Sequence, residues 1–124
     1  MNVATITAQG RLSTSVALTY TTTGRPQADF DVAVNHRRRN VGGEWEDAPT
    51  TFLTVRAFGR LAENIATLAK GAAVLIVGDL VTDEWTARGS GEKRRKTKVL
   101  ASAGGPDYSA GQVAGETPVS VEAQ

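Results

Sequence analysis

Two phenylalanines and an arginine fall on alternate positions of the segment TFLTVRAF, residues 51–58. Phe52, Arg56 and Phe58 share one parity, whereas Leu53 and Val55 share the other. A strand with this alternation turns its aliphatic side into a core and its aromatic side outward. Exposed rings stack on nucleic-acid bases, and a guanidinium pairs with phosphate. The segment therefore predicts a nucleic-acid-binding strand, although either ring could instead cap a second core against a loop or a partner subunit.

Basic residues gather in two runs on either side of this segment. The first run is Arg37, Arg38 and Arg39, and the second contains Lys93, Arg94 and Arg95. Three of the 13 acids and none of the basic residues follow residue 103, so residues 1–103 hold 14 Lys and Arg against 10 Asp and Glu. Clustered cations indicate a polyanion partner, with solvated loops as the alternative. Trp85, just before the second run, offers a third ring.

Residues that could support catalysis are sparse. His36 is the only histidine and adjoins three arginines, the chain has no cysteine, and the common catalytic and phosphate-loop motifs are absent. Asp29 and Asp31 could share a metal, but two acidic residues at this spacing more often lie on the solvent-exposed face of a strand. The sequence predicts a binding protein without a cofactor, not an enzyme. Without a signal peptide or an apolar run of ~18 residues, it also predicts a cytoplasmic location.

Alternation with a period of two dominates the chain. Strands are predicted at residues 3–12, 16–20, 27–35, 51–58, 73–85 and 93–103. Leu61, Ile65 and Leu68 recur at helical spacing, which predicts a helix over residues 60–69 that stops at Gly71. Residues 104–124 are rich in Gly, Pro, Ser and Ala without a period, which predicts a flexible tail.

The order of these elements predicts an all-β fold. Five main strands, with one helix between the third and the fourth, fit a five-stranded Greek-key barrel of the OB type. Another small β-barrel or sandwich with an inserted helix is the alternative. The predicted organisation is one domain at residues 1–103 followed by the tail at residues 104–124.

The most specific stretch is TFLTVRAFGRLAENIATLAKGAAVLIVGDLVTDEW. An aromatic strand runs into F-G-[KR]-L-A-E-N, then K-G, an apolar strand with V-G-x-L, and a terminal Trp. This pattern resembles the bacterial single-stranded DNA-binding proteins, over roughly residues 2–103, and GRPQADFDVAVN is similar to the family's second strand. The resemblance implies an OB fold that binds single-stranded DNA without sequence preference in replication, recombination or repair. It also implies a homotetramer, with a homodimer as the alternative.

The resemblance assigns roles to named positions. Phe52, Phe58 and Trp85 match the family's base-stacking aromatics. Arg56 and Arg60 lie among its phosphate-contacting positions. These five residues form the DNA-binding set that the resemblance implies, and the basic residues near Trp85 extend it.

The run from Arg37 to Arg39 matches the start of the family's flexible loop between the second and third strands. Many relatives place a stacking Trp nearby, and this chain has Arg38 instead. A guanidinium also stacks on bases and attracts phosphate, so we expect binding here to be more salt-sensitive than in relatives. Trp45, further along the loop, could add a ring or only hold the loop in place.

Two departures from the family pattern bear on function. Asp83 and Glu84 stand before Trp85, where relatives are usually basic, and the cations of residues 88–98 are expected to offset their repulsion. The chain ends in GETPVSVEAQ, without the acidic Pro-Phe tip through which relatives recruit repair and replication proteins. The sequence therefore predicts no recruitment through this end, and favours a shorter member such as a specialised paralogue or a phage or plasmid version.

Leu75 and Val77 make the strand at residues 73–85 apolar on both faces. The barrel covers one face, and we expect a second subunit to cover the other, with a loop or the start of the tail as the alternative. Two other functions remain open from the residues: an RNA-binding OB module, or an oligomerising adaptor that has lost DNA binding.

Overall fold

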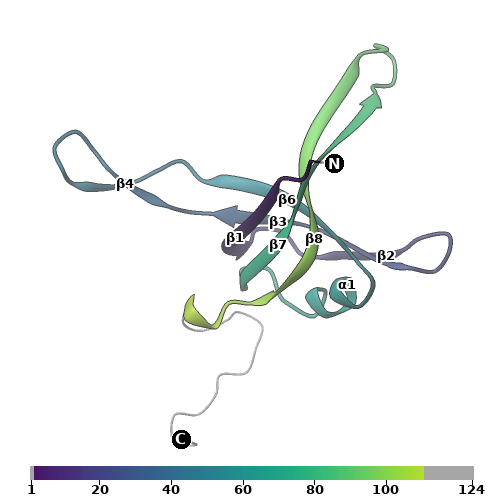
Figure 1. Ribbon diagram of the computed structural model, residues 1–124, viewed down its shortest axis with the longest axis horizontal. Coiled ribbons are helices and arrows are strands. Elements are labelled where there is room, and N and C mark those ends of the chain that lie inside the picture. Colours follow the sequence, from purple (N-terminus) through teal and green to yellow (C-terminus); the bar gives the residue numbers. More distant parts are fainter. Residues whose placement is uncertain (1, 111–124) are drawn as a thin grey trace, which may run out of the picture.

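The structure is a computed structural model that describes residues 2–110, and Figure 1 shows a small barrel with three projecting hairpins. The strands are β1 (Thr5–Leu12), β2 (Ala17–Tyr20), β3 (Pro26–Val34), β4 (Arg37–Arg39), β5 (Trp45–Asp47), β6 (Thr51–Phe58), β7 (Ala73–Thr86) and β8 (Lys93–Pro106). The helices are α1 (Gly59–Ile65) and the short 3-10 turn η1 (Tyr108–Ala110). Apart from β4 and β5, which the sequence analysis did not predict, the strands fall within a few residues of the predicted positions.

Five long strands close into a ring. Their hydrogen-bonded order is β1-β7-β8-β6-β3, and β3 returns to β1 through the pairs Arg11–Ala33 and Leu12–Val32. Only β6 and β8 pair in parallel, with Val55 beside Val99. Counted along the chain, the main strands follow the circular order first, second, third, fifth and fourth. With α1 between the third and fourth of them, this is the predicted OB-type Greek-key barrel.

The inward positions of the ring hold the core. Val32, Val55, Val74, Ile76 and Val99 are all buried to within about 1% of full coverage. Each such side chain stabilises the fold by roughly 1.5–3 kcal/mol relative to exposure. Helix α1 packs against this cluster through two further buried residues of its own. The alternation seen in the sequence therefore sorts correctly into an inner face and an outer face.

The helix is shorter than its apolar spacing predicts. It ends at Ile65. The Ala66 N–H still bonds four residues back, but the Thr67 N–H bonds to the Asn64 carbonyl and the Leu68 N–H to the Ile65 carbonyl, three residues back. Such bonds tighten the last turn and release the chain from the helix. Leu68 still packs against the core, so the apolar spacing correctly predicts its burial, but the prediction that it is helical is wrong.

The predicted domain boundary at residue 103 falls inside β8. Residues 104–106 pair with β7, with Gly105 opposite Leu75, and the Asp107 N–H then bonds to the Ala73 carbonyl at 2.9 Å. Residues 104–110 therefore belong to the barrel. Their strand could not be predicted from the sequence, because Gly104 and Gly105 have no side chains and so show no apolar–polar alternation. The rest of the predicted tail, residues 111–124, lies outside the described residues.

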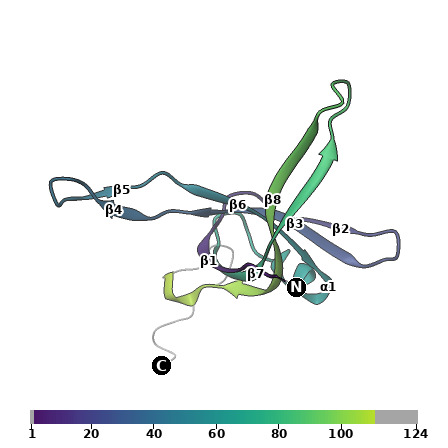
Figure 2. The same cartoon turned by 45° about the horizontal axis from the view of Figure 1, so that its top comes forward.

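Three hairpins leave the barrel as arms, β2–β3, β4–β5 and β7–β8, in clearly different directions (Figures 1 and 2). The β4–β5 arm corrects the prediction of a flexible loop at residues 35–50. It is a two-stranded ribbon, with Arg37 opposite Asp47 and Arg39 opposite Trp45. Asn40 closes its turn by exchanging backbone hydrogen bonds with Glu44 and Gly43.

Candidate nucleic-acid interface

The outer face of β6 carries the predicted aromatic pair. Val55 and Ala57 are completely buried, so the residues that alternate with them along β6 point outward. Phe52 is 65% exposed, and Phe58 is partly buried. Because the alternation of β6 is unbroken, both rings and Arg56 stand on one surface.

Arg56 is held in place by the neighbouring strand. Its Nε donates to Asp29 Oδ1 at 2.7 Å, and Gln27 Nε2 donates to Asp29 Oδ2 at 3.0 Å. These three residues are register neighbours across β3 and β6, and about a third of the Arg56 side chain remains exposed. The predicted phosphate-contacting guanidinium is therefore oriented beside the rings by the Asp29 carboxylate, and an incoming phosphate would compete with that carboxylate for it.

The Phe58 ring has a cationic neighbour that the sequence analysis did not predict. The Arg25 guanidinium lies 4.5 Å from its centroid, a cation–π distance. Arg25 sits in the turn between β2 and β3, just before Pro26. The TTTGRP turn was visible in the sequence, but the pairing of Gln27 with Phe58, which brings Arg25 close, was not.

Trp85 lies on the same outer surface as the two phenylalanines. The register passes from Arg56 to Leu100 across β6 and β8, and from Leu100 to Asp79 across β8 and β7. Residues of matching parity along the β7–β8 arm share that face, and they include Trp85 and its register partner Arg94. Trp85 is 46% exposed. Two phenylalanines, a tryptophan and two arginines therefore line one continuous face that runs from the barrel onto the arm.

The second predicted basic run divides between the two faces of the arm. Arg94 lies on the Trp85 face, together with Lys96, whereas Lys93 and Arg95 lie on the opposite face. Glu84 shares that opposite face and contacts both cations there. The prediction named three consecutive residues, and strand alternation separates them.

The acidic residue on the Trp85 face is also neutralised. Asp83 forms an ion pair with Lys98, whose side chain is only 11% exposed. Asp83 and Glu84 thus point to opposite faces, and each has a basic partner within the arm. The sequence analysis expected nearby cations to offset the repulsion between these two carboxylates and DNA, and the ion pairs supply such cations.

The three arginines of β4 each face one residue of β5. Arg37 Nε lies 3.6 Å from Asp47, and Arg38 Nε lies 3.3 Å from Glu46. The Arg39 guanidinium lies 5.2 Å from the Trp45 ring centroid. By register, Arg37, Arg39 and Trp45 share one face of the ribbon and Arg38 occupies the other. Trp45 therefore both stacks against the ribbon and keeps an exposed ring, 55% accessible.

The remaining predicted residues are Arg60, Leu75 and Val77. Arg60 is exposed in the first turn of α1. Leu75 and Val77 are on the outer side of β7 where it pairs with β1, and Leu75 stays 39% exposed. Their neighbours are Gly105 and Ala103 on β8 and the polar residues Gln9 and Thr7 on β1, so the apolar strip is narrow.

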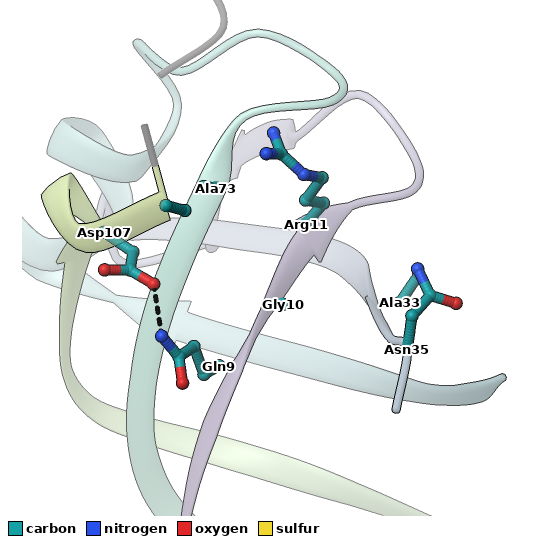
Figure 3. A pocket seen from close by; sticks show the side chains of 8 residues that line it. Gln9, Gly10, Arg11, Ala33, Asn35, Ala73 and Asp107 are labelled. Carbon is teal, nitrogen blue, oxygen red and sulfur yellow. Dashed lines mark hydrogen bonds between the residues drawn. The ribbon is translucent and has the colours of Figure 1, made fainter. Parts of the chain in front are cut away.

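A buried carboxylate fixes the end of β8 beside this surface. Asp107 accepts hydrogen bonds from Ser109 Oγ at 2.6 Å, from Gln9 Nε2 at 2.7 Å and from the Ser109 N–H at 2.9 Å. These bonds, the hydroxyl first, hold the pKa of Asp107 below its usual value although burial opposes them. Figure 3 shows Gln9 and Asp107 meeting at one side of a small pocket, with Arg11 and Asn35 at its other margins.

Within residues 2–110, no three His, Asp or Glu side chains are grouped as a metal site. Asp29, one of the two aspartates considered as ligands, is engaged by Arg56 and Gln27. No helix in the same range is long and apolar enough to cross a membrane.

Known proteins are similar to this chain in sequence and in fold. The chain is 36% identical over 93 residues to the single-stranded DNA-binding protein of Aquifex aeolicus, and 41% identical over 92 residues to that of Thermus aquaticus. Each alignment covers 74% of this chain, but only 61% and 33% of the respective relatives. The chain thus spans about three fifths and one third of their lengths.

Solved structures match over most of the barrel. The crystal structure of a small single-stranded DNA-binding protein from Streptomyces coelicolor superposes with a TM-score of 0.74 at 30% identity, over 90% of this chain and all of that one. A Plasmodium falciparum complex with single-stranded DNA has the same fold, with a TM-score of 0.73 at 21% identity, over 85% of this chain and 93% of that one. The model of the Single-strand binding protein family matches residues 1–105. This chain is a member of that family.

Proposed function

We propose that this protein binds and protects single-stranded DNA without sequence preference, in replication, recombination or repair. The observation that carries the proposal is the continuous outer face on which Phe52, Phe58 and Trp85 lie with Arg56 and Arg94. Rings spaced along one surface offer platforms to successive bases, and every base has a face that can stack. The protein acts by binding, not by catalysis, and works at DNA in the cytoplasm.

The arginines supply the electrostatic part of binding. Arg56 and Arg94 stand beside the rings, where phosphates between stacked bases would pass. Arg60 on α1 and the Arg37–Arg39 ribbon extend the cationic path beyond them. Lys93 and Arg95, predicted in the same set, face the other way and are considered below.

The outer side of β7 supports assembly through a second copy of the chain, up to a homotetramer. Leu75 and Val77 form a narrow apolar strip on the outer side of the barrel, and an exposed apolar strip is more stable when a partner covers it. Leu75→Glu should shift the protein to a smaller species in light scattering, while far-UV circular dichroism stays unchanged. An unchanged mass would contradict this interface.

The decisive experiment is a fluorescence titration with oligo-dT. Tryptophan emission, to which Trp45 and Trp85 both contribute, should be quenched as bases stack on the rings. Affinity should fall with salt at a log–log slope near −0.7 for each neutralised phosphate. Phe52→Ala should weaken binding by about 1–3 kcal/mol. Tyr20→Ala is the matched control, because Tyr20 is similarly exposed but shares the opposite face of its arm, with Pro26. Neither quenching nor a gel shift at low salt would reject the proposal.

A further inference from the structure

The reverse face of the β7–β8 arm is basic, yet its cations are already engaged. Glu84 Oε1 lies 3.7 Å from Lys93 Nζ, and Glu84 Oε2 accepts a hydrogen bond from Arg95 Nε at 3.0 Å. One carboxylate therefore serves two cations, one through each oxygen. Trp85 points to the other face, so this side offers phosphate contacts at most and no ring for a base.

The Trp85 face of the same arm is less constrained. Lys96 stands opposite Asp83 in the register, but Asp83 forms its ion pair with Lys98. Arg94 forms an ion pair with Glu92 of the turn, at 3.7 Å. Among residues 2–110, Lys96 has no carboxylate within ion-pair distance. Lys96 therefore lies beside the ring without a competing carboxylate in that range, whereas Lys93 and Arg95 share one carboxylate behind it.

We propose that Glu84 is a specificity-determining residue that withholds Lys93 and Arg95 from phosphate and so makes the arm select single strands over duplex. This inference rests on the proposed function. A single strand offers unpaired bases to Trp85, which adds stacking to the charge attraction. A duplex keeps its bases stacked on one another and is attracted by cations alone. When Glu84 engages two cations, duplex therefore loses a larger fraction of its binding free energy than a single strand does.

The fold does not require Glu84 for its stability. The Lys93 and Arg95 side chains are 76% and 73% exposed, and ion pairs in such settings contribute little to folding. The charge of Glu84 nevertheless repels any phosphate that approaches either cation. Glu84→Gln keeps the shape of the side chain and removes that charge, so it isolates the proposed role.

The test measures binding of oligo-dT and of a mixed-sequence duplex of equal length over a range of NaCl concentrations. Glu84→Gln should bind duplex more tightly, with a log–log salt slope steeper by about 1.8 if two further phosphates are contacted. For oligo-dT the slope should steepen by at most about 1.4. Glu63→Gln is the matched control, since Glu63 is an exposed carboxylate on α1 and its loss changes the net charge equally.

A second pair of variants separates release of the cations from a general change of charge. The double change Lys93→Gln with Arg95→Gln should alter binding little in the wild-type background, and should abolish the gain in the Glu84→Gln background. Equal effects in both backgrounds, or an equal gain from Glu63→Gln, would overturn the inference. If the wild type quenches with oligo-dT while Glu84→Gln leaves duplex binding unchanged, only this inference fails. If the wild type does not bind oligo-dT, both proposals fail.

Discussion

The β7–β8 and β4–β5 arms look alike in composition but differ in how they join the barrel. Each is a ribbon with one tryptophan and a basic run facing acidic residues. The β7–β8 arm continues the ladder of two barrel strands, from Val74 opposite Pro106 out to Thr86 opposite Lys93. The β4–β5 arm is a separate sheet of three residue pairs. The barrel register therefore sets side-chain direction in the first arm, whereas the second arm sets its own.

This difference decides what each tryptophan can do. Trp85 is fixed relative to Phe52 and Phe58, because the register is unbroken from Arg56 through Leu100 and Asp79 out to Trp85. Trp45 is fixed relative to Arg39, which covers part of its ring. A base that passes from the barrel to the first arm meets an aligned platform. The second arm instead presents a local pairing of ring and guanidinium.

The largest expected effect comes from the point where the first arm begins. The β7–β8 ladder shifts register between Val77 and Gly78, and a Cβ at Gly78 would lie 2.5 Å from the Leu100 carbonyl oxygen. Gly78→Ala should lower the free energy of unfolding by about 1–3 kcal/mol through overpacking. Gly105→Ala is the control, since a Cβ there meets nothing within 4 Å. Equal denaturation midpoints for the two variants would contradict this account of the junction.

The next effect compares the two tryptophans directly. Trp85→Ala should weaken oligo-dT binding by about 1–3 kcal/mol, because an aligned stacking platform is lost. Trp45→Ala should cost less, because Arg39 already occupies part of the ring. Anisotropy of a labelled oligonucleotide at fixed salt measures both. Equal losses would show that the separate sheet of β4–β5 aligns its ring as well as the barrel does.

A smaller effect tests whether the β4–β5 ribbon is also one-sided. Arg37 and Arg39 share the Trp45 face, so replacing both with Gln should make the salt slope shallower by up to about 1.4. Arg38→Gln should change the slope less, because Arg38 lies on the other face with Glu46. If Arg38→Gln alone has the larger effect, the strand enters on the reverse face of the ribbon.

The smallest effect concerns the tip of the β4–β5 arm. Gly43 has a φ of +81°, a region that side chains other than Gly disfavour. Gly43→Ala should loosen the ribbon by about 1 kcal/mol and speed amide exchange in β4 and β5. The thermal midpoint of the barrel should stay unchanged, since the ribbon is a separate sheet. A drop in the global midpoint would mean that the ribbon and the barrel unfold together.

The fold was largely readable from the sequence, because a barrel wall is buried on one side and exposed on the other. Val55 and Ala57 against Phe52 and Phe58 gave the correct faces of β6. The ribbon at β4 and β5 was not readable. Its residues are exposed on both faces, so no burial pattern marks them as strands. The end of β8 was hidden for a related reason, since Gly104 and Gly105 leave no alternation to detect.

The sequence predicted the candidate interface as a set of residues, not as a surface. The aromatic residues came from local alternation, which a single strand reveals. Arg25 beside Phe58, and Asp29 holding Arg56, depend on pairing between strands distant in the sequence. The division of Arg94 from Lys93 and Arg95 depends on register across the hairpin. Those features require knowing which residues face one another.

The shared register of barrel and arm also restricts how this hairpin can change length during evolution. Insertion of a single residue between Gly78 and Trp85 would turn the tryptophan to the side now held by Glu84, because neighbouring side chains alternate. Changes of two residues in a strand would preserve its direction. The turn at residues 87–92 lies beyond the last ladder pair and carries no such restriction. Length variation among related chains should therefore come in steps of two along the strands and in any number at the tip.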